Sequence, residues 1–124
     1  MNKPFFIQKV EDAIPLKIER SSYEKEFLSI SGSEWSFATS SAWRVISKEG
    51  LCFGWESTGS EEEIRTLEGV SVVGVKPLGI GNLDIQLELD NGRFLESFTA
   101  QFYEPWELTL PDKTIIVADG GAIE

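Results

Sequence analysis

The chain contains no histidine and only one cysteine and one methionine among its 124 residues. Without histidine, the Ser/His/Asp and Cys/His arrangements that activate a nucleophile are excluded in their usual form. Carboxylates, lysines and tyrosines remain as candidate acids and bases, and they offer few routes to catalysis at neutral pH. We therefore expect a protein that is not an enzyme and that acts by binding.

A single cysteine cannot form an intramolecular disulfide, and no residues have the spacing of a zinc site. Cys52 lies between Leu51 and Phe53. Because a free cysteine often behaves as a small hydrophobic residue, we expect a buried structural thiol at this position. The sequence indicates no cofactor and no metal.

Basic residues are also scarce, because 11 Lys and Arg stand against 21 Asp and Glu, for a net charge of -10. Residues 1–60 hold 8 acids and 7 bases, net -1, whereas residues 61–124 hold 13 acids and 4 bases, net -9. This balance argues against binding to nucleic acid or to an anionic membrane surface. No apolar run has the length of a signal peptide or a membrane span, so we expect a cytoplasmic protein.

Apolar residues are plentiful enough for one core, with 41% hydrophobic residues that include 4 Trp and 8 Phe. Two cores would each be too small to be stable, which predicts a single domain over residues 1–124. Short segments in which apolar and polar residues alternate indicate β-strands. The expected strands cover residues 16–20, 27–31, 35–38, 43–47, 51–56, 70–75, 83–90, 106–110 and 114–118.

The periodicity changes at residues 60–68, where Ser60 and Glu63 match the two positions of a capping box. Acids in a first turn also suit the helix dipole. The predicted fold is therefore mostly β, with an antiparallel sheet that forms an open barrel or a two-layer sandwich and one short helix.

The clearest strand precedes Asn91-Gly92, a pair that favours a two-residue hairpin turn because both central positions need positive φ. This turn pairs Leu89 with Phe94 on an apolar face. It also brings Glu96 opposite Leu87 on that face. We expect either a bulge that changes the register there or a partly exposed face.

Acidic side chains occupy the other face of this strand, at Asp84, Glu88 and Asp90. Alternate residues on a strand lie about 7 Å apart, which is too open for one calcium site. The segment of residues 101–107 is both aromatic and acidic, and it contributes Tyr103, Glu104 and Glu107. Its simpler interpretation is a connection whose Trp106 anchors the core. Its functional interpretation is a recognition edge, since Tyr and Trp are enriched at binding hot spots.

The C-terminal half resembles a family of small acidic bacterial proteins of the immunity type, found in polymorphic toxin and contact-dependent growth inhibition systems. The resemblance covers about residues 60–122. It depends on Leu67-Glu68-Gly69-Val70, Asp90-Asn91-Gly92, Glu104-Pro105-Trp106-Glu107-Leu108, Pro111-Asp112 and Asp119-Gly120-Gly121. Lys113 departs from the pattern where a glycine would complete a turn, and so does Ala118 where a proline would be expected.

The resemblance implies a protein that binds and neutralises a cognate toxin, with a nuclease as the first candidate, by blocking its basic active-site cleft. It carries over no functional residues. The predicted partner-binding residues are then Asp84, Glu88, Asp90, Tyr103, Glu104 and Glu107. Two alternatives remain. One is an interaction module that self-associates through an edge strand, for example as a homodimer. The other is a small-ligand barrel with a cavity lined by Trp35, Trp43, Trp55 and Trp106.

Overall fold

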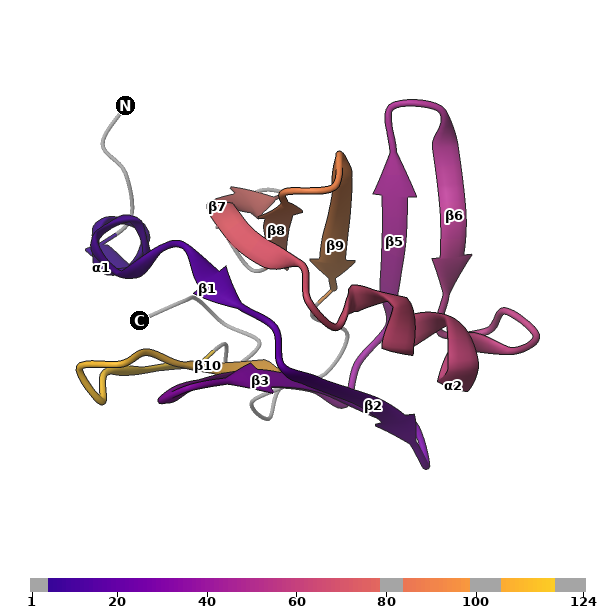
Figure 1. Cartoon of the computed structure of the whole chain (residues 1–124), viewed down its shortest axis with the longest axis horizontal. Coiled ribbons are helices and arrows are strands. Elements are labelled where there is room, and N and C mark those ends of the chain that lie inside the picture. The colour runs from indigo at the N-terminus through magenta and orange to yellow at the C-terminus, as the bar shows by residue number, and fades with distance from the viewer. Residues whose placement is uncertain (1–4, 79–83, 99–105, 118–124) are drawn as a thin grey trace.

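The computed structural model describes residues 5–78, 84–98 and 106–117 of the chain. The described strands form two antiparallel sheets that face each other and cross at a large angle (Figure 1). Sheet A runs in the order β1 (Leu16–Lys17), β7 (Ser71–Leu78), β8 (Asp84–Leu89), β9 (Arg93–Ser97), β5 (Trp43–Ser47) and β6 (Gly50–Gly54). Sheet B runs in the order β11 (Ile115–Val117), β10 (Trp106–Thr109), β4 (Trp35–Thr39), β3 (Phe27–Gly32) and β2 (Arg20–Glu24). The mostly β prediction is confirmed, and the arrangement is a two-layer sandwich.

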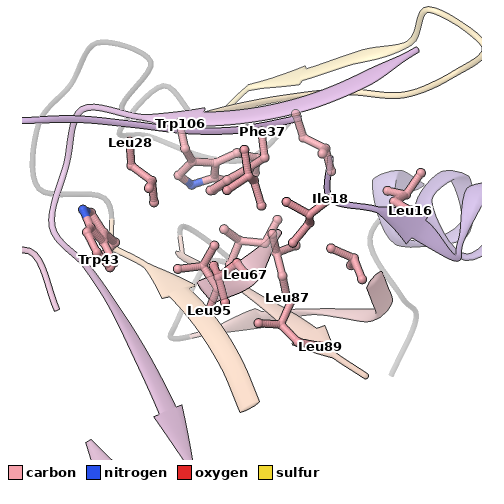
Figure 2. Close-up of a cluster of buried hydrophobic side chains, with 14 of the residues drawn as sticks. Leu16, Ile18, Leu28, Phe37, Trp43, Leu67, Leu87, Leu89, Leu95 and Trp106 are labelled. Atoms are coloured by element: carbon pink, nitrogen blue, oxygen red, sulfur yellow. The ribbon is translucent and has the colours of Figure 1, made fainter. Parts of the chain in front are cut away.

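The inner faces of the two sheets bury one continuous hydrophobic cluster (Figure 2). Alternation along each strand produces these faces, because successive side chains point to opposite sides of a sheet. In β8, for example, Ile85, Leu87 and Leu89 are buried, whereas the residues between them are more exposed. Sheet B faces them with Leu28, Phe37 and Trp106.

Three of the four tryptophans belong to this core. Trp35, Trp43 and Trp106 are at most 4% exposed, whereas Trp55 is 43% exposed. The Trp35 indole N–H donates to the Lys17 carbonyl at 2.9 Å, and Trp43 packs edge-on against Tyr23 and Phe53. The tryptophans predicted to line a ligand cavity therefore fill the core at three positions, because the two inner faces close upon them.

Helix α1 (Phe5–Ala13) was not expected from the sequence. It ends before Pro15, and its Val10, Ala13 and Ile14 have the helical spacing that brings them to one face. Val10 is fully buried, and Ala13 and Ile14 pack against the same core. This amphipathic stretch is short and begins next to Pro4, so its periodicity was too weak to identify.

The predicted helix at residues 60–68 is present as α2 (Ser60–Glu63), which continues into the 3₁₀ helix η1 (Ile64–Leu67). The capping-box prediction is wrong. Gly59, with φ 81°, precedes the helix, and no side chain caps the helix start. Ser60 is buried, and its hydroxyl donates to the Ser57 carbonyl.

The turn between β8 and β9 also differs from the prediction. Gly92 has φ 84° and donates its N–H to the Leu89 carbonyl at 3.3 Å. Asn91 does not have the positive φ that a two-residue turn would require. This is the three-residue turn that ends in a left-handed glycine. It shifts the pairing by one residue, so Leu87 faces Leu95 and Gln86 faces Glu96. A one-residue shift reverses the two faces, and Glu96 thereby leaves the apolar side.

Cys52 is exposed, which corrects the prediction of a buried thiol. In the β5–β6 pair, Val45 lies opposite Phe53 and Ile46 lies opposite Leu51. Cys52 is therefore the extra residue of a β-bulge, and a bulge changes the direction in which side chains point. The alternation that placed Cys52 with its apolar neighbours does not continue through this position.

Candidate functional site

Asp84 and Glu88 lie where the alternation predicts them, whereas Asp90 does not, because β8 ends at Leu89. Asp84 and Glu88 are on the outer face of sheet A, and Asp90 is in the turn that follows the strand. The Asp90 carboxylate accepts a hydrogen bond from the Ser71 backbone N–H at 3.2 Å, which ties the turn to β7. The Glu88 side chain lies over Gly74, where an added Cβ would meet its carboxylate oxygen at 2.9 Å.

Glu107 lies on a different face of the molecule. In β10, Trp106 and Leu108 are buried and Glu107 is exposed, so Glu107 is on the outer face of sheet B. The two outer faces point away from each other across the core. The structure therefore does not bring Glu107 to the same surface as Asp84 and Glu88. The remaining predicted residues, Tyr103 and Glu104, lie outside the described residues.

A neutralised row separates Asp84 from Glu88 on the outer face of sheet A. Glu96 accepts from the Arg44 Nε at 2.8 Å and from the Gln86 amide at 2.6 Å, and its side chain is only 5% exposed. The three residues lie side by side on β5, β9 and β8. Because Arg44 compensates the charge of Glu96, this part of the outer face adds little net negative charge.

A second group of acidic residues lies at the end of the sandwich where α2 contacts β2 and β6. Glu26 belongs to the β2–β3 turn, Glu56 follows β6, and Glu61 is in α2. All three act electrostatically on the hydroxyl of one residue, Tyr23. We call Glu26, Glu56 and Glu61 the acidic end.

Tight turns expose two of these acidic residues, Glu26 and Glu56. Lys25 and Glu26 have φ 51° and 64°, and Glu24 pairs with Phe27 across them. This is a two-residue hairpin turn with positive φ at both central positions, a geometry that glycine and asparagine usually provide. After β6, the Ser57 hydroxyl accepts from the Gly54 N–H at 2.9 Å, and the resulting turn leaves Trp55 and Glu56 exposed.

Tyr23 connects the acidic end to the core. Its ring is 7% exposed and packs edge-on against Trp43 with ring centroids 5.1 Å apart. Its hydroxyl donates to the Trp55 carbonyl at 3.1 Å. Burial is the main cause that raises the pKa of Tyr23, and the carboxylates of Glu26, Glu61 and Glu56 raise it further, while the Trp43 indole acts in the opposite sense. Three acids from separate segments thus reinforce one another's field at this point.

The acidic end combines negative charge with exposed aromatic rings. Trp55 is 43% exposed and Phe27 is 49% exposed. Within the parts of the chain that the structure describes, the salt bridges join Lys9 to Asp112 and Arg44 to Glu96, so none involves Glu26, Glu56 or Glu61. Unpaired carboxylates beside exposed rings can attract and hold a basic surface.

Sequence reasoning missed this group because its members are far apart in the chain. The run of Glu61, Glu62 and Glu63 looked like a solvated helix start, and the charged Tyr23-Glu24-Lys25-Glu26 stretch has no usual turn signal. One signal was present: Trp55 stands between Gly54 and Glu56, an arrangement that does not continue the apolar alternation of β6.

Comparisons with known proteins provide no relative for this chain. No protein-family model matches it, and no curated protein and no solved structure matches it either. In residues 5–78, 84–98 and 106–117, no three His, Cys, Asp or Glu side chains gather as a metal site would require. No helix in that part of the chain combines the length and apolar character needed to cross a membrane. The candidate site therefore depends on its geometry and charge.

Proposed function

We propose that this chain is an immunity-type protein that binds a cognate toxin stoichiometrically and blocks the toxin's basic active-site cleft, with a nuclease as the first candidate. The main supporting observation is that Glu26, Glu56 and Glu61, which come from separate segments, all act on Tyr23, whose hydroxyl donates to the carbonyl of the exposed Trp55. The resemblance of residues 60–122 to immunity-type proteins supplies the class of partner. In such a role the protein acts in the cytoplasm, where it meets an incoming toxin.

The physical basis is charge complementarity. A nuclease cleft uses Lys and Arg to hold phosphates, and its positive potential attracts a surface of unpaired carboxylates. Such attraction speeds association and orients the encounter. The exposed Trp55 then supplies apolar contact area next to Glu56.

The test compares three double charge reversals that change the net charge equally. E56K/E61K reverses the acidic end, D84K/E88K reverses the outer face of β8, and E34K/E49K reverses exposed acids in other turns. The candidate partner used in this test is the protein encoded by the gene immediately upstream of the gene for this chain. Binding is measured by surface plasmon resonance at low and high salt, together with inhibition of the partner's toxicity.

We expect E56K/E61K to lower the association rate at least about tenfold at low salt, because steering by charge contributes factors of this size. The same variant should bind with a weaker dependence on salt, and E34K/E49K should behave like the unmodified protein. If D84K/E88K has the large effect instead, the predicted β8 site is right and the acidic end is not the binding surface. Unchanged binding in both variants contradicts an electrostatic inhibitor.

A self-associating interaction module is the second candidate, and it too has an observation in its favour. Strand β6 has one neighbour, β5, among the described strands, and its Leu51 is 68% exposed. An open edge can pair with a second chain. A molar mass that rises with concentration, measured by light scattering, would favour this function over a monomeric inhibitor.

A further inference from the structure

A hollow of about 450 Å³ lies directly beside the acidic end. Its apolar walls come from Leu51, Trp55 and Phe98, and the rest of the lining comes from Trp43, Arg44, Gly54, Glu56 and Ser57. Leu51 and Trp55 expose 68% and 43% of their surface. The hollow therefore presents apolar side chains to the outside at the point where the outer face of sheet A meets the acidic end.

Gly54, a buried residue of β6, lies at the hollow. Gly54 pairs with Arg44 across the β5–β6 ladder, so a side chain there would stand on the outer face. An added Cβ would lie 3.2 Å from the Trp43 carbonyl oxygen and 3.5 Å from the Arg44 Cβ. A side chain at Gly54 would therefore crowd the Trp43 carbonyl oxygen and Arg44, two residues that also line the hollow.

Arg44 forms a fixed wall of the hollow. Its guanidinium lies over the Phe98 ring, 5.0 Å from the ring centroid, while its Nε donates to Glu96 at 2.8 Å. The ion pair and the ring contact hold the side chain in one position before any partner binds. Because Glu96 balances its charge, Arg44 does not prevent a cationic group from approaching the rim.

The rim of the hollow is acidic. Glu56 lines it, and the Trp55 carbonyl accepts the hydroxyl of Tyr23, the residue on which the charges of Glu26 and Glu61 converge. An apolar floor inside a negative rim complements one kind of protein surface. That surface presents a bulky apolar side chain between lysines or arginines.

We propose that this hollow binds one bulky apolar side chain of a basic protein partner, flanked on that partner by Lys or Arg residues that meet Glu56 and Glu61. This inference rests on the proposed function, because it names the feature of the toxin that the chain recognises. The carboxylates and the hollow are expected to act on different rate constants of binding. The carboxylates govern the association rate, and the anchored side chain governs the dissociation rate.

The first experiment does not require the toxin. The full-length ¹⁵N-labelled chain is titrated with three synthetic pentapeptides, KKFKK, KKSKK and EEFEE, and followed by heteronuclear NMR. We expect KKFKK to shift the Trp55 indole signal and the backbone amides of Leu51 and Gly54, with saturation in the millimolar range. KKSKK should shift them less, and EEFEE should leave them unchanged.

Each other outcome of the titration overturns the inference. Equal shifts with KKFKK and KKSKK would mean that charge alone acts. Shifts confined to other residues would mean that the hollow is not the binding site. No shift with any peptide would mean that the hollow does not accept a side chain.

The second experiment measures dissociation of the toxin complex. Trp55→Ala removes one wall of the hollow, and the matched control Ile115→Ala removes a 60% exposed apolar side chain from β11 in sheet B. We expect Trp55→Ala to raise the dissociation rate about 30-fold, as for a binding hot spot, with little change in the association rate. Ile115→Ala should change neither rate. Leu51→Ala repeats the test if Trp55→Ala is poorly folded by circular dichroism.

The two experiments separate the two proposals. If Trp55→Ala and Leu51→Ala bind the toxin as the unmodified protein does, and no peptide binds, the hollow is not a binding site but the proposed inhibitor function stands. Peptide binding at the hollow without any toxin complex overturns the proposed function and leaves the hollow. Self-association of the unmodified chain that Trp55→Ala abolishes would identify a second copy as the occupant and overturn the inference.

Discussion

The outer face of sheet A and the acidic end use carboxylates in opposite ways. On sheet A, Glu96 is buried and satisfied by Arg44 and Gln86. At the acidic end, the carboxylates of Glu56 and Glu61 are exposed and have no salt bridge among the described residues. A buried and paired charge is costly to disrupt, whereas exposed unpaired charges repel one another weakly and remain ready for a partner. The first region holds the fold, and we expect the second to bind.

The largest effect on stability is expected when Arg44, the cation that pairs with Glu96, is removed. Arg44→Met keeps the aliphatic part of the side chain and leaves a carboxylate that is 5% exposed without its cation. We expect the free energy of unfolding to fall by about 3 kcal/mol, because a buried charge then lacks compensation. Denaturation in urea provides the measurement.

Lys76→Met is the matched control, since it removes one positive charge from an exposed position on β7 of the same sheet. Its effect should stay within about 0.5 kcal/mol, as for most surface substitutions. Equal losses in the two variants would show that the ion pair of Arg44 contributes nothing specific.

The next variant, Tyr23→Phe, acts where the acidic end joins the core. It deletes the hydrogen bond to the Trp55 carbonyl, and we expect a loss of about 1 kcal/mol in the free energy of unfolding at neutral pH. Burial and the nearby carboxylates raise the pKa of Tyr23 above its usual 10.0. The unfolded chain therefore ionises first as the pH rises.

This difference has a definite sign. The raised pKa gives the folded state stability that is fully present below about pH 10 and is lost as the pH rises through the folded pKa. Tyr23→Phe lacks this dependence, so the difference in stability between the two proteins should narrow above about pH 10. A difference that stays constant with pH would mean that the phenol ionises equally in both states.

The smallest effect should come from neutralising the acidic end itself. In E56Q/E61Q, two charges that act on Tyr23 disappear. We expect the free energy of unfolding at low salt to rise by about 0.3 kcal/mol, because repulsion between exposed charges is weak. The pKa of Tyr23, measured by ultraviolet absorbance, should fall.

E34Q/E49Q removes two exposed acids elsewhere and is the control for total charge. It should leave the pKa of Tyr23 unchanged. A fall of equal size in both variants would mean that the whole protein's charge acts on Tyr23 and that the acidic end is not a local feature.

Much of the sandwich follows from alternation in the sequence. The pattern of Ile85, Leu87 and Leu89 identified β8 and its buried face correctly, because a period of two is a local property of an extended chain. The same reasoning put Asp84 and Glu88 on the outer face, where they lie. It could not detect α1, because the burial of Val10 and Ala13 depends on packing against the core of the sandwich.

A turn and a β-bulge caused the two errors in the predicted direction of side chains. Asn91-Gly92 was correctly recognised as a turn, yet the choice between two and three residues decides the register and moved Glu96 from one face to the other. A bulge in β6 likewise exposed Cys52. These choices depend on which arrangement lets the neighbouring strands pair, and the local sequence allows both.

Three properties can be read from the amino-acid sequence alone: the antiparallel strands, the side chains of β8 that face the core, and the large excess of negative charge. Tertiary packing is what lets Glu26, Glu56 and Glu61 act together on Tyr23, and it forms the hollow beside Trp55. The two kinds of property differ in the sequence separation over which they arise. Alternation and composition act over a few residues, whereas a binding surface requires segments that long-range strand pairing brings together.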